Sequence, residues 1–492
     1  MAGTFTGPGF DLQPSAQQVP LATNYITNFD FLNQYLPDTY DKEFERYGNR
    51  TIGSFLRLVG AELPSNSDLI KWAEQGRLHV KYTQVGTAAA AGDDDALFQV
   101  NDPAAPVGQP TTGQDPFDAT GGIALREGQT VVVSQNDGSG ENKGIITDVD
   151  LTVSPIQFTV AFYEGGGLVT AGTGVGNADV TVWIYGSEFR KGTEGMIGSL
   201  ESDDFIFENS PIIIKDRYAV SGSDMAQIGW VEVTTENGAS GYLWYLKSEH
   251  ETRLRFDDYL ETAMVEAVPA EAGSGVITPA SNPTYGNKGS EGIFHTVGDR
   301  GNLWTGGIPN VLADFDTIIG RLDTQGAIEE NVLFVDRAFG FAIDDMLATQ
   351  NSYGAGGTSY GLFDNDEEMA LNLGFSGFRR GYDFYKTDWK YLNDPTMRGS
   401  NPTGASSGHI NGLLVPAGST SVYDQILGKN AKRPYLHVRY RASETEDRRY
   451  KTWITGSAGG AATSSLDAME VHFLSERCVC TMGANNFVLF ED

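Results

Sequence analysis

The chain has 492 residues and a mass of 53.2 kDa, which is enough for about two to four domains. Its 65 Asp and Glu residues outnumber its 34 Lys and Arg residues, and no basic run exceeds two residues, so the net charge of −31 disfavours sequence-specific reading of duplex DNA. Two cysteines exclude a disulfide scaffold, no apolar run could span a membrane, and no signal peptide is recognisable, so we expect folding in a cytoplasm.

The N-terminal region predicts an arm followed by short helices. Residues 1–50 are polar with scattered aromatic residues and prolines, which is typical of an arm that docks on a body or on a neighbour. Residues 51–76 predict helical segments, because Asn66 or Ser67 can cap a first turn and Gly76 can end it. The buried side of that helix would consist of Leu69, Ile70, Trp72 and Ala73.

Residues 77–240 predict a long projection, an extended loop that leaves the body and returns to it. Residues 77–84 alternate as a strand, and a low-complexity connector follows. Short β runs separated by Gly-rich turns then predict a small barrel or sandwich inserted at 121–192. Residues 200–235 are again extended and would return the chain to the body.

The longest predicted helix covers residues 241–267 and would act as a spine about 40 Å long. Its apolar face should pack on a sheet near the C-terminus that includes two buried, reduced cysteines, Cys478 and Cys480. Its charged face, Glu249 to Asp258, should lie toward a surface or a neighbour's arm. The apolar positions are four residues apart: Phe256, Leu260, Met264 and Val268.

A compact α/β region is predicted over residues 305–430. Asn310–Thr324 has amphipathic helical spacing, NVLFVD forms a buried strand after it, and a second helix begins near Arg337. The strand-like segments GYDFYKTDW and GLLVPAG complete this region. Residues 431–492 are β-rich, and we expect them to pair in one sheet with the spine packed on it.

Catalytic patterns are weak throughout. The GxSxG match at 404–408 lacks the strand and helix that a nucleophile elbow needs, and His250-Glu251 is not part of an HExxH motif. The acidic runs at 93–95 and 364–368 lack EF-hand spacing, and the Gly-rich stretches at 172–176 and 354–357 lack the phosphate-binding pattern. We therefore predict no catalytic, cofactor-binding or metal site and no cofactor, although a carboxylate pair for glycoside hydrolysis remains an alternative.

The order of elements resembles the major capsid protein of tailed bacteriophages, the Hong Kong 97-type fold, which is an α+β fold. Four segments carry the resemblance, which is strongest to crAss-like phages. They are NFDFLNQYLPDTYDKEFERYGNRTIGSFLRLVGAELPSNSDLIKWAEQGRLHVKY, IIIKDRYAVSGSDMAQIGWVEV, GYLWYLKSEHETRLRFDDYLETAMVE and ERCVCTMGANNFVLFE.

The resemblance implies a domain plan. Residues 1–50 would be the N-terminal arm, 51–76 helices of the peripheral domain, and 77–240 the E-loop with a β insertion at 121–192. Residues 241–304 would supply the spine helix and more of the peripheral domain, 305–430 the axial domain, and 431–492 the peripheral sheet.

The implied function is structural and not enzymatic. The chain would assemble with itself as hexamers and pentamers into an icosahedral shell that encloses double-stranded DNA without reading its sequence. Implied partners are a portal, decoration or head-fibre proteins, and a scaffold protein, with no membrane. The protein would fold and assemble in the cytoplasm of a bacterial host and end in the virion capsid. Alternatives are a phage tail or baseplate protein and an encapsulin-like compartment.

Overall fold

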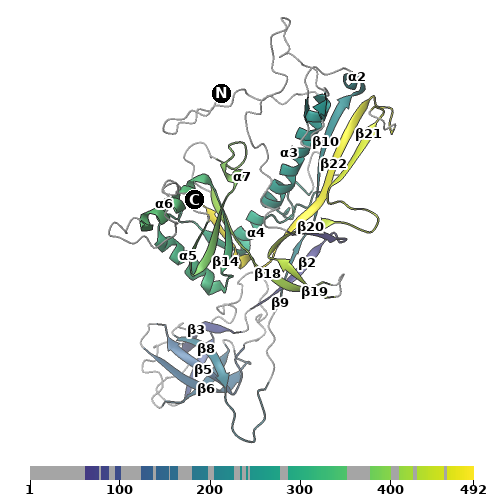
Figure 1. Cartoon of the computed structure of the whole chain (residues 1–492). Coiled ribbons are helices and arrows are strands. Elements are labelled where there is room, and N and C mark those ends of the chain that lie inside the picture. The colour runs from purple at the N-terminus through teal and green to yellow at the C-terminus, as the bar shows by residue number, and fades with distance from the viewer. Residues whose placement is uncertain are drawn as a thin grey trace. The chain divides into compact units, whose positions relative to one another are not determined.

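The computed structural model describes two compact units (Figure 1). One, the barrel unit, is Lys71–Phe207, and the other, the body, is Glu208–Asp492 together with the chain up to Ile70. The described residues are 61–76, 79–87, 95–100, 124–136, 140–153, 156–164, 180–197, 204–226, 233–234, 240–241, 244–277, 286–351, 377–399, 409–424, 429–458 and 463–491.

Six antiparallel strands close the barrel in the order β3-β4-β7-β6-β5-β8. They are β3 (Lys81–Thr87), β4 (Asp95–Val100), β5 (Gln129–Gln135), β6 (Glu141–Asp150), β7 (Gln157–Phe162) and β8 (Val180–Ser187). Alternate side chains point inward and fill the interior, and the rings of Phe98 and Phe158 stack with centroids 5.5 Å apart.

The barrel confirms the β architecture of the inserted module but corrects its boundary. The prediction began the module at residue 121, whereas β3 and β4 lie between 81 and 100 and are barrel strands. Closure explains the difference, because β3 pairs with both β4 and β8, and without these two strands the sheet would have two open edges.

The helix predicted within residues 66–76 is wrong. This part of the chain holds two strands, β1 (Ala61–Ser65) and β2 (Ile70–Gln75), and β2 pairs with β9 (Asp204–Asn209). Burial along β2 alternates with a period of two, so Trp72 is half-buried while its neighbour Ala73 is exposed. On the same side of the strand, the Trp72 indole donates to Glu74 at 3.0 Å, and its ring contacts Phe207.

The body contains a five-stranded sheet in the order β1-β20-β22-β10, with β21 also paired to β22. Its later strands are β20 (Leu436–Arg441), β21 (Lys451–Gly456) and β22 (Ala468–Thr481), as the sequence predicted. β10 (Ile212–Ser221) was expected in the returning projection, but it pairs with β22 along its whole length and belongs to the body sheet. The short helix α2 (Gly222–Met225) follows it.

The predicted spine is α3 (Trp244–Glu266), which runs along β10 and β22 (Figure 1). Phe256, Leu260 and Met264 are buried, and the Phe256 ring lies 5.7 Å from that of Phe473 on β22, so the packing of the spine on the C-terminal sheet is confirmed. Val268 was assigned to the same face wrongly, because it lies beyond the helix end and is 59% exposed.

A second sheet of six strands has the order β13-β23-β17-β14-β16-β15. The helices α5 (Leu312–Gln325) and α6 (Arg337–Asn351) pack on one face of it, through Phe315 and Phe339 among others, as predicted. Its strands are β13 (Asn302–Trp304), β14 (Glu330–Val335), β15 (Gly377–Arg380), β16 (Tyr382–Asp388), β17 (Ile410–Pro416) and β23 (Val488–Glu491). β23 was expected in the spine sheet; it pairs with β13 and β17 instead.

One apolar core joins the two sheets of the body. It includes Met264 of α3, Phe294 of α4 (Ile293–Arg300), Trp389 before α7 (Lys390–Asn393), Leu413 of β17 and Val479 of β22. The remaining elements are β11 (Val233–Thr234), β12 (Ser240–Gly241), β18 (Ser419–Asp424), β19 (Lys429–Pro434) and η3 (Ala484–Asn486). Among the described residues, no helix combines the length and apolarity needed to cross a membrane.

Candidate functional site: the charged cluster of the body sheet

The densest group of charges in the described chain lies where β1 meets β20 and β22. β1 runs parallel to β20, and the turn between β20 and β21 carries Arg and Glu residues back over the same region. We call this group the charged cluster; its members are Glu62, Asp68, Arg441, Glu446, Arg448, Arg449, Lys451, Glu476 and Arg477.

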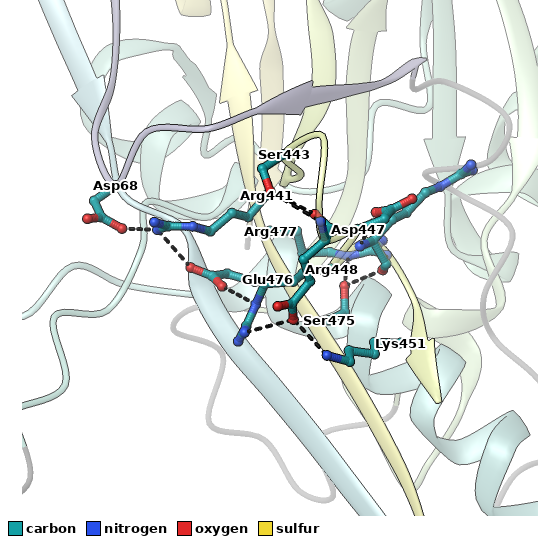
Figure 2. A network of polar contacts seen from close by, with 11 residues as sticks. Asp68, Arg441, Ser443, Asp447, Arg448, Lys451, Ser475, Glu476 and Arg477 are labelled. Atoms are coloured by element: carbon teal, nitrogen blue, oxygen red, sulfur yellow. Dashed lines mark hydrogen bonds and ion pairs between the residues drawn. The ribbon is translucent and has the colours of Figure 1, made fainter. Parts of the chain in front are cut away.

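Glu476 is the acceptor on one face of β22. It is 7% exposed, and its carboxylate lies 3.3 Å from the Arg441 guanidinium and 2.6 Å from that of Arg448. Figure 2 shows Arg441 between Glu476 and Asp68, and Asp68 accepts a second bond from the same guanidinium. A chain of alternating charge therefore links the β1–β2 connection to β20 and to the turn after it.

Arg477 is the donor on the opposite face, because adjacent residues of a strand point to opposite sides. It donates to Glu62 of β1 at 3.2 Å, to the Ser475 hydroxyl at 2.8 Å and to the Arg449 carbonyl at 2.9 Å. Burial lowers the pKa of Arg477 from its ordinary value, and the attraction of Glu62 opposes that effect. Arginine keeps its charge in proteins, so the desolvation cost is met by these bonds.

The turn between β20 and β21 is closed by its own contacts. Ser443 donates its backbone N–H to the Glu446 carbonyl at 2.8 Å, and Arg448 donates to the Arg441 carbonyl at 3.0 Å. Lys451 lies 2.7 Å from the Glu446 carboxylate and lowers its pKa, with Arg448 adding a weaker effect. The turn therefore holds its arginines over β22 (Figure 2).

The charged cluster holds strands of the body sheet together through ion pairs. Basic and acidic side chains alternate and pair with one another, so the arrangement fixes the strands relative to each other. Bonds from β1 reach residues hundreds of positions away, as in the pair Glu62–Arg477. The cluster was not predicted from the sequence, although five of the 34 Lys and Arg residues fall within 439–451 and mark this region as rich in basic residues.

A second polar centre was also missed. Asn209, at the end of β9, is 4% exposed, and its amide donates to the carbonyls of Glu291 and Val479 at 2.9 and 2.7 Å. Its oxygen accepts from the Ser290 hydroxyl and the Glu291 N–H, both at 2.9 Å. A single amide thus fixes the point where the chain enters the body, and nothing in the local sequence marks it.

A third polar contact fixes the end of the spine. Glu266, the last residue of α3, accepts from the Tyr391 hydroxyl and from Arg398, whose closest nitrogen lies 2.5 Å away. Burial raises the pKa of Tyr391, and the bond to Glu266 adds to that effect. The guanidinium of Arg398 also lies over the Phe294 ring at 5.4 Å. These contacts join α3 to the region of the second sheet.

The structure describes few of the residues in the weak catalytic patterns. The GxSxG match at 404–408, the acidic run at 364–368 and the Gly-rich stretches at 172–176 and 354–357 all lie outside the described residues, as do positions 93 and 94. Cys478 and Cys480 are buried free thiols, as expected. Within the described ranges, no three His, Cys, Asp or Glu side chains are placed to hold a metal ion.

His472 and His409 have different neighbours. His472 stacks on Trp453 with ring centroids 5.0 Å apart and bonds to the Thr455 hydroxyl at 2.7 Å. His409 lies 3.7 Å from Asp336, whose carboxylate accepts from the Phe339 N–H at 2.6 Å and so caps the start of α6. These contacts are structural.

Comparison with known proteins gives likeness of structure without likeness of sequence. No family model and no curated protein matches the chain. A structure from Microbacterium phage Oxtober96 is similar with a TM-score of 0.38 and 10% identity, covering 92% of this chain and 95% of the other. The capsid of cyanophage P-SCSP1u has a TM-score of 0.33 and 9% identity, covering 78% and 96%.

An encapsulin complex from Synechococcus elongatus is similar at the same level, with a TM-score of 0.31 and 10% identity, covering 59% of this chain and 77% of the other. The structures that this chain is similar to thus include phage capsids and an encapsulin. The three structures named here all have TM-scores below 0.5 and identities of 10% or less.

Proposed function

We propose that this chain is a structural capsid protein that assembles with itself, as hexamers and pentamers, into an icosahedral shell around double-stranded DNA. The observation that carries the proposal is the path of the chain at the spine. It leaves the body through β2, forms a separate barrel unit, returns through β9 and enters the body sheet as β10, directly against α3.

This path supports the domain plan implied by the resemblance, with corrected boundaries. The excursion Lys71–Phe207 corresponds to the E-loop and carries the barrel. The sheet with α3 corresponds to the peripheral domain, and it takes in β1 and β10 as well as the C-terminal strands. The second sheet with α5 and α6 corresponds to the axial domain and takes in β23. The proposed N-terminal arm at 1–50 lies outside the described residues.

The charge of the chain agrees with enclosing DNA rather than binding it. A net charge of −31 repels a polyanion and avoids fixing the packaged duplex to the inner wall. Shell proteins hold together through many symmetric contacts, each of them weak. Portal, decoration or head-fibre proteins and a scaffold are the partners that such a shell uses, and assembly would take place in the cytoplasm of a bacterial host.

The test is to express the full chain, alone and with a neighbouring scaffold gene, and to examine the product by negative-stain electron microscopy. Closed shells or free hexamers are the expected result. A matched variant replaces residues 76–203 with a short Gly/Ser linker between β2 and β9, and it should fold as a body but lose the lattice contacts of the excursion.

Other outcomes would redirect the proposal. Rods or trimers would indicate a tail or baseplate protein, and shells that enclose a protein cargo would indicate an encapsulin-like compartment. A stable monomer with glycoside hydrolase activity would overturn the structural role.

A further inference from the structure

The outer wall of the barrel carries an exposed group of aromatic side chains. Trp183 and Tyr185, both on β8, are 41% and 47% exposed, and their rings meet edge to face with centroids 6.3 Å apart. Tyr163, just after β7, is 50% exposed, and its hydroxyl bonds to Glu188, the residue directly after β8. We call these three residues the aromatic patch. Exposed apolar groups that gather on one wall are more often functional than residues scattered singly over a surface.

A backbone irregularity supports a role for the aromatic patch. Along β8, Ile184 pairs with Val131 and Gly186 pairs with Thr130, so Tyr185 is an extra residue in a β-bulge. Bulges re-aim a side chain at the expense of a regular ladder, and they are common beside functional sites. Tyr185 lies on the same side of β8 as Trp183, as alternation along a strand requires, and the bulge lies directly beside the two rings.

Groups that form hydrogen bonds surround the rings. The Tyr163 hydroxyl donates to the exposed carboxylate of Glu188 at 2.5 Å. In register, Trp183 lies opposite the exposed Lys81 on β3 and opposite Val132 on β5, and the next residue of that row is the exposed Lys143 on β6. Donors and acceptors of both charges therefore border the patch.

We propose that the aromatic patch binds a carbohydrate chain, with the rings of Trp183 and Tyr185 stacked on the apolar C–H faces of sugar rings. The hydroxyls of the sugar would donate to Glu188 and accept from Lys81 and Lys143. This use of the barrel does not depend on shell assembly, so the two proposals can fail separately.

The other classes of occupant fit less well. A strand-forming peptide needs an open sheet edge, and the barrel is closed. The exposed ring surface is roughly 300 Å², whereas a stable protein partner buries about 800 Å² on each side. A polyanion would meet Glu188 and the acidic charge of the whole chain. A neutral polyhydroxylated ligand uses the rings and both kinds of polar group.

The test is saturation-transfer NMR on the full-length protein with cellohexaose, maltohexaose, laminarihexaose and chitohexaose, followed by calorimetric titration of the best binder. Trp183→Ala should weaken binding about tenfold or more, and Trp183→Phe, which keeps a ring, should restore part of it. Phe341→Ala removes an aromatic residue of α6 that is 58% exposed, and it should leave binding unchanged. Shell formation by each variant is scored on the same samples.

Binding to none of the four neutral oligosaccharides at millimolar concentration would overturn the inference. Equal affinity of wild type and Trp183→Ala would do the same. Binding restricted to dextran sulfate and abolished by salt would show a polyanion on the lysines instead. A failure of the variants to form shells, with sugar binding intact, would bear on the assembly proposal alone.

Discussion

The barrel and the body sheet solve the problem of strand pairing in different ways. In the barrel, every strand has two partners, and the interior consists of apolar side chains such as Phe98 and Phe158. The body sheet is open, and β1 lies at its edge. Among the described residues, the charged side chains that are buried all belong to the body: Glu261, Asp336, Arg433, Glu476 and Arg477.

The difference follows from how far apart the paired strands lie in the chain. All six strands of the barrel come from residues 81–187, three of the six neighbouring pairs are consecutive strands, and closure leaves no edge where the register can slip. The body sheet joins β1 to strands near residue 440 and residue 477, so its register has to be specified at long range. Ion pairs with two or three partners, such as those of Glu62 and Glu476, favour one register over its neighbours.

The largest loss of stability should come from removing an aromatic ring from the barrel core. Phe98→Ala removes a fully buried ring, and we expect a loss of about 3–5 kcal/mol in the free energy of unfolding of the barrel. Because the barrel is a separate compact unit, it should melt in an early calorimetric transition while the body transition stays in place. Phe341→Ala, at an exposed site, is the control. A single transition shifted as a whole would contradict the independence of the two units.

Apolar periodicity predicted the secondary structure correctly where a long element carries the full repeat within its own sequence. The apolar spacing of Phe315, Ile318 and Leu322 predicted α5, and that of Phe256, Leu260 and Met264 predicted α3. The short run at Ile70–Gln75 was misassigned as a helix because a few apolar residues fit both periods, and only the pairing with β9 decides between them.

Pairing between distant segments could not be predicted. Nothing in the local sequence of β23 says that it joins β13 and β17 rather than β22, and nothing near β3 says that it closes onto β8. The charged cluster has the same origin, since Glu62 and Arg477 meet only after the fold forms. Its arginines are visible in the sequence, but their acidic partners on β1 and β22 are not identifiable there.

The next largest loss of stability should come from a substitution in the charged cluster of the body. Glu476→Ala leaves Arg441 and Arg448 without their shared carboxylate in a largely buried place, and we expect a loss of about 2–3 kcal/mol. The body transition should move and the barrel transition should not, the reverse of Phe98→Ala. Glu446→Ala, in the exposed turn, is the matched control and should change little. Equal effects of the two substitutions would show that burial of the acid is not what matters.

Alkaline pH should destabilise the body, because buried tyrosines pack against α3. Burial raises the pKa of Tyr450 from 10.0 to about 12, with Asp257 adding to the shift. The folded body keeps this proton longer than the unfolded chain does, so the stabilisation is complete below pH 10 and is lost as the pH rises toward 12. Between about pH 9 and about pH 11, the free energy of unfolding measured in urea should fall less for Tyr450→Phe than for wild type. Tyr259→Phe, at an exposed position of α3, should behave as wild type does, and an equal loss in all three proteins would contradict the assignment.

The smallest effect should come from an ion pair that lies in water. Arg380 on β15 donates two bonds to Asp316 on α5, and the two side chains are 42% and 50% exposed. The guanidinium lowers the pKa of Asp316, but solvent screens the pair, so Arg380→Ala should leave the urea midpoint of the body at its wild-type value. Comparing the stability loss of Arg380→Ala with that of Glu476→Ala separates the effect of bond geometry from the effect of burial. Arg380 makes a bidentate contact with Asp316, whereas Glu476 is the more buried of the two residues. If Arg380→Ala destabilises the body as much as Glu476→Ala does, the charged cluster owes its effect to the number of bonds and not to desolvation.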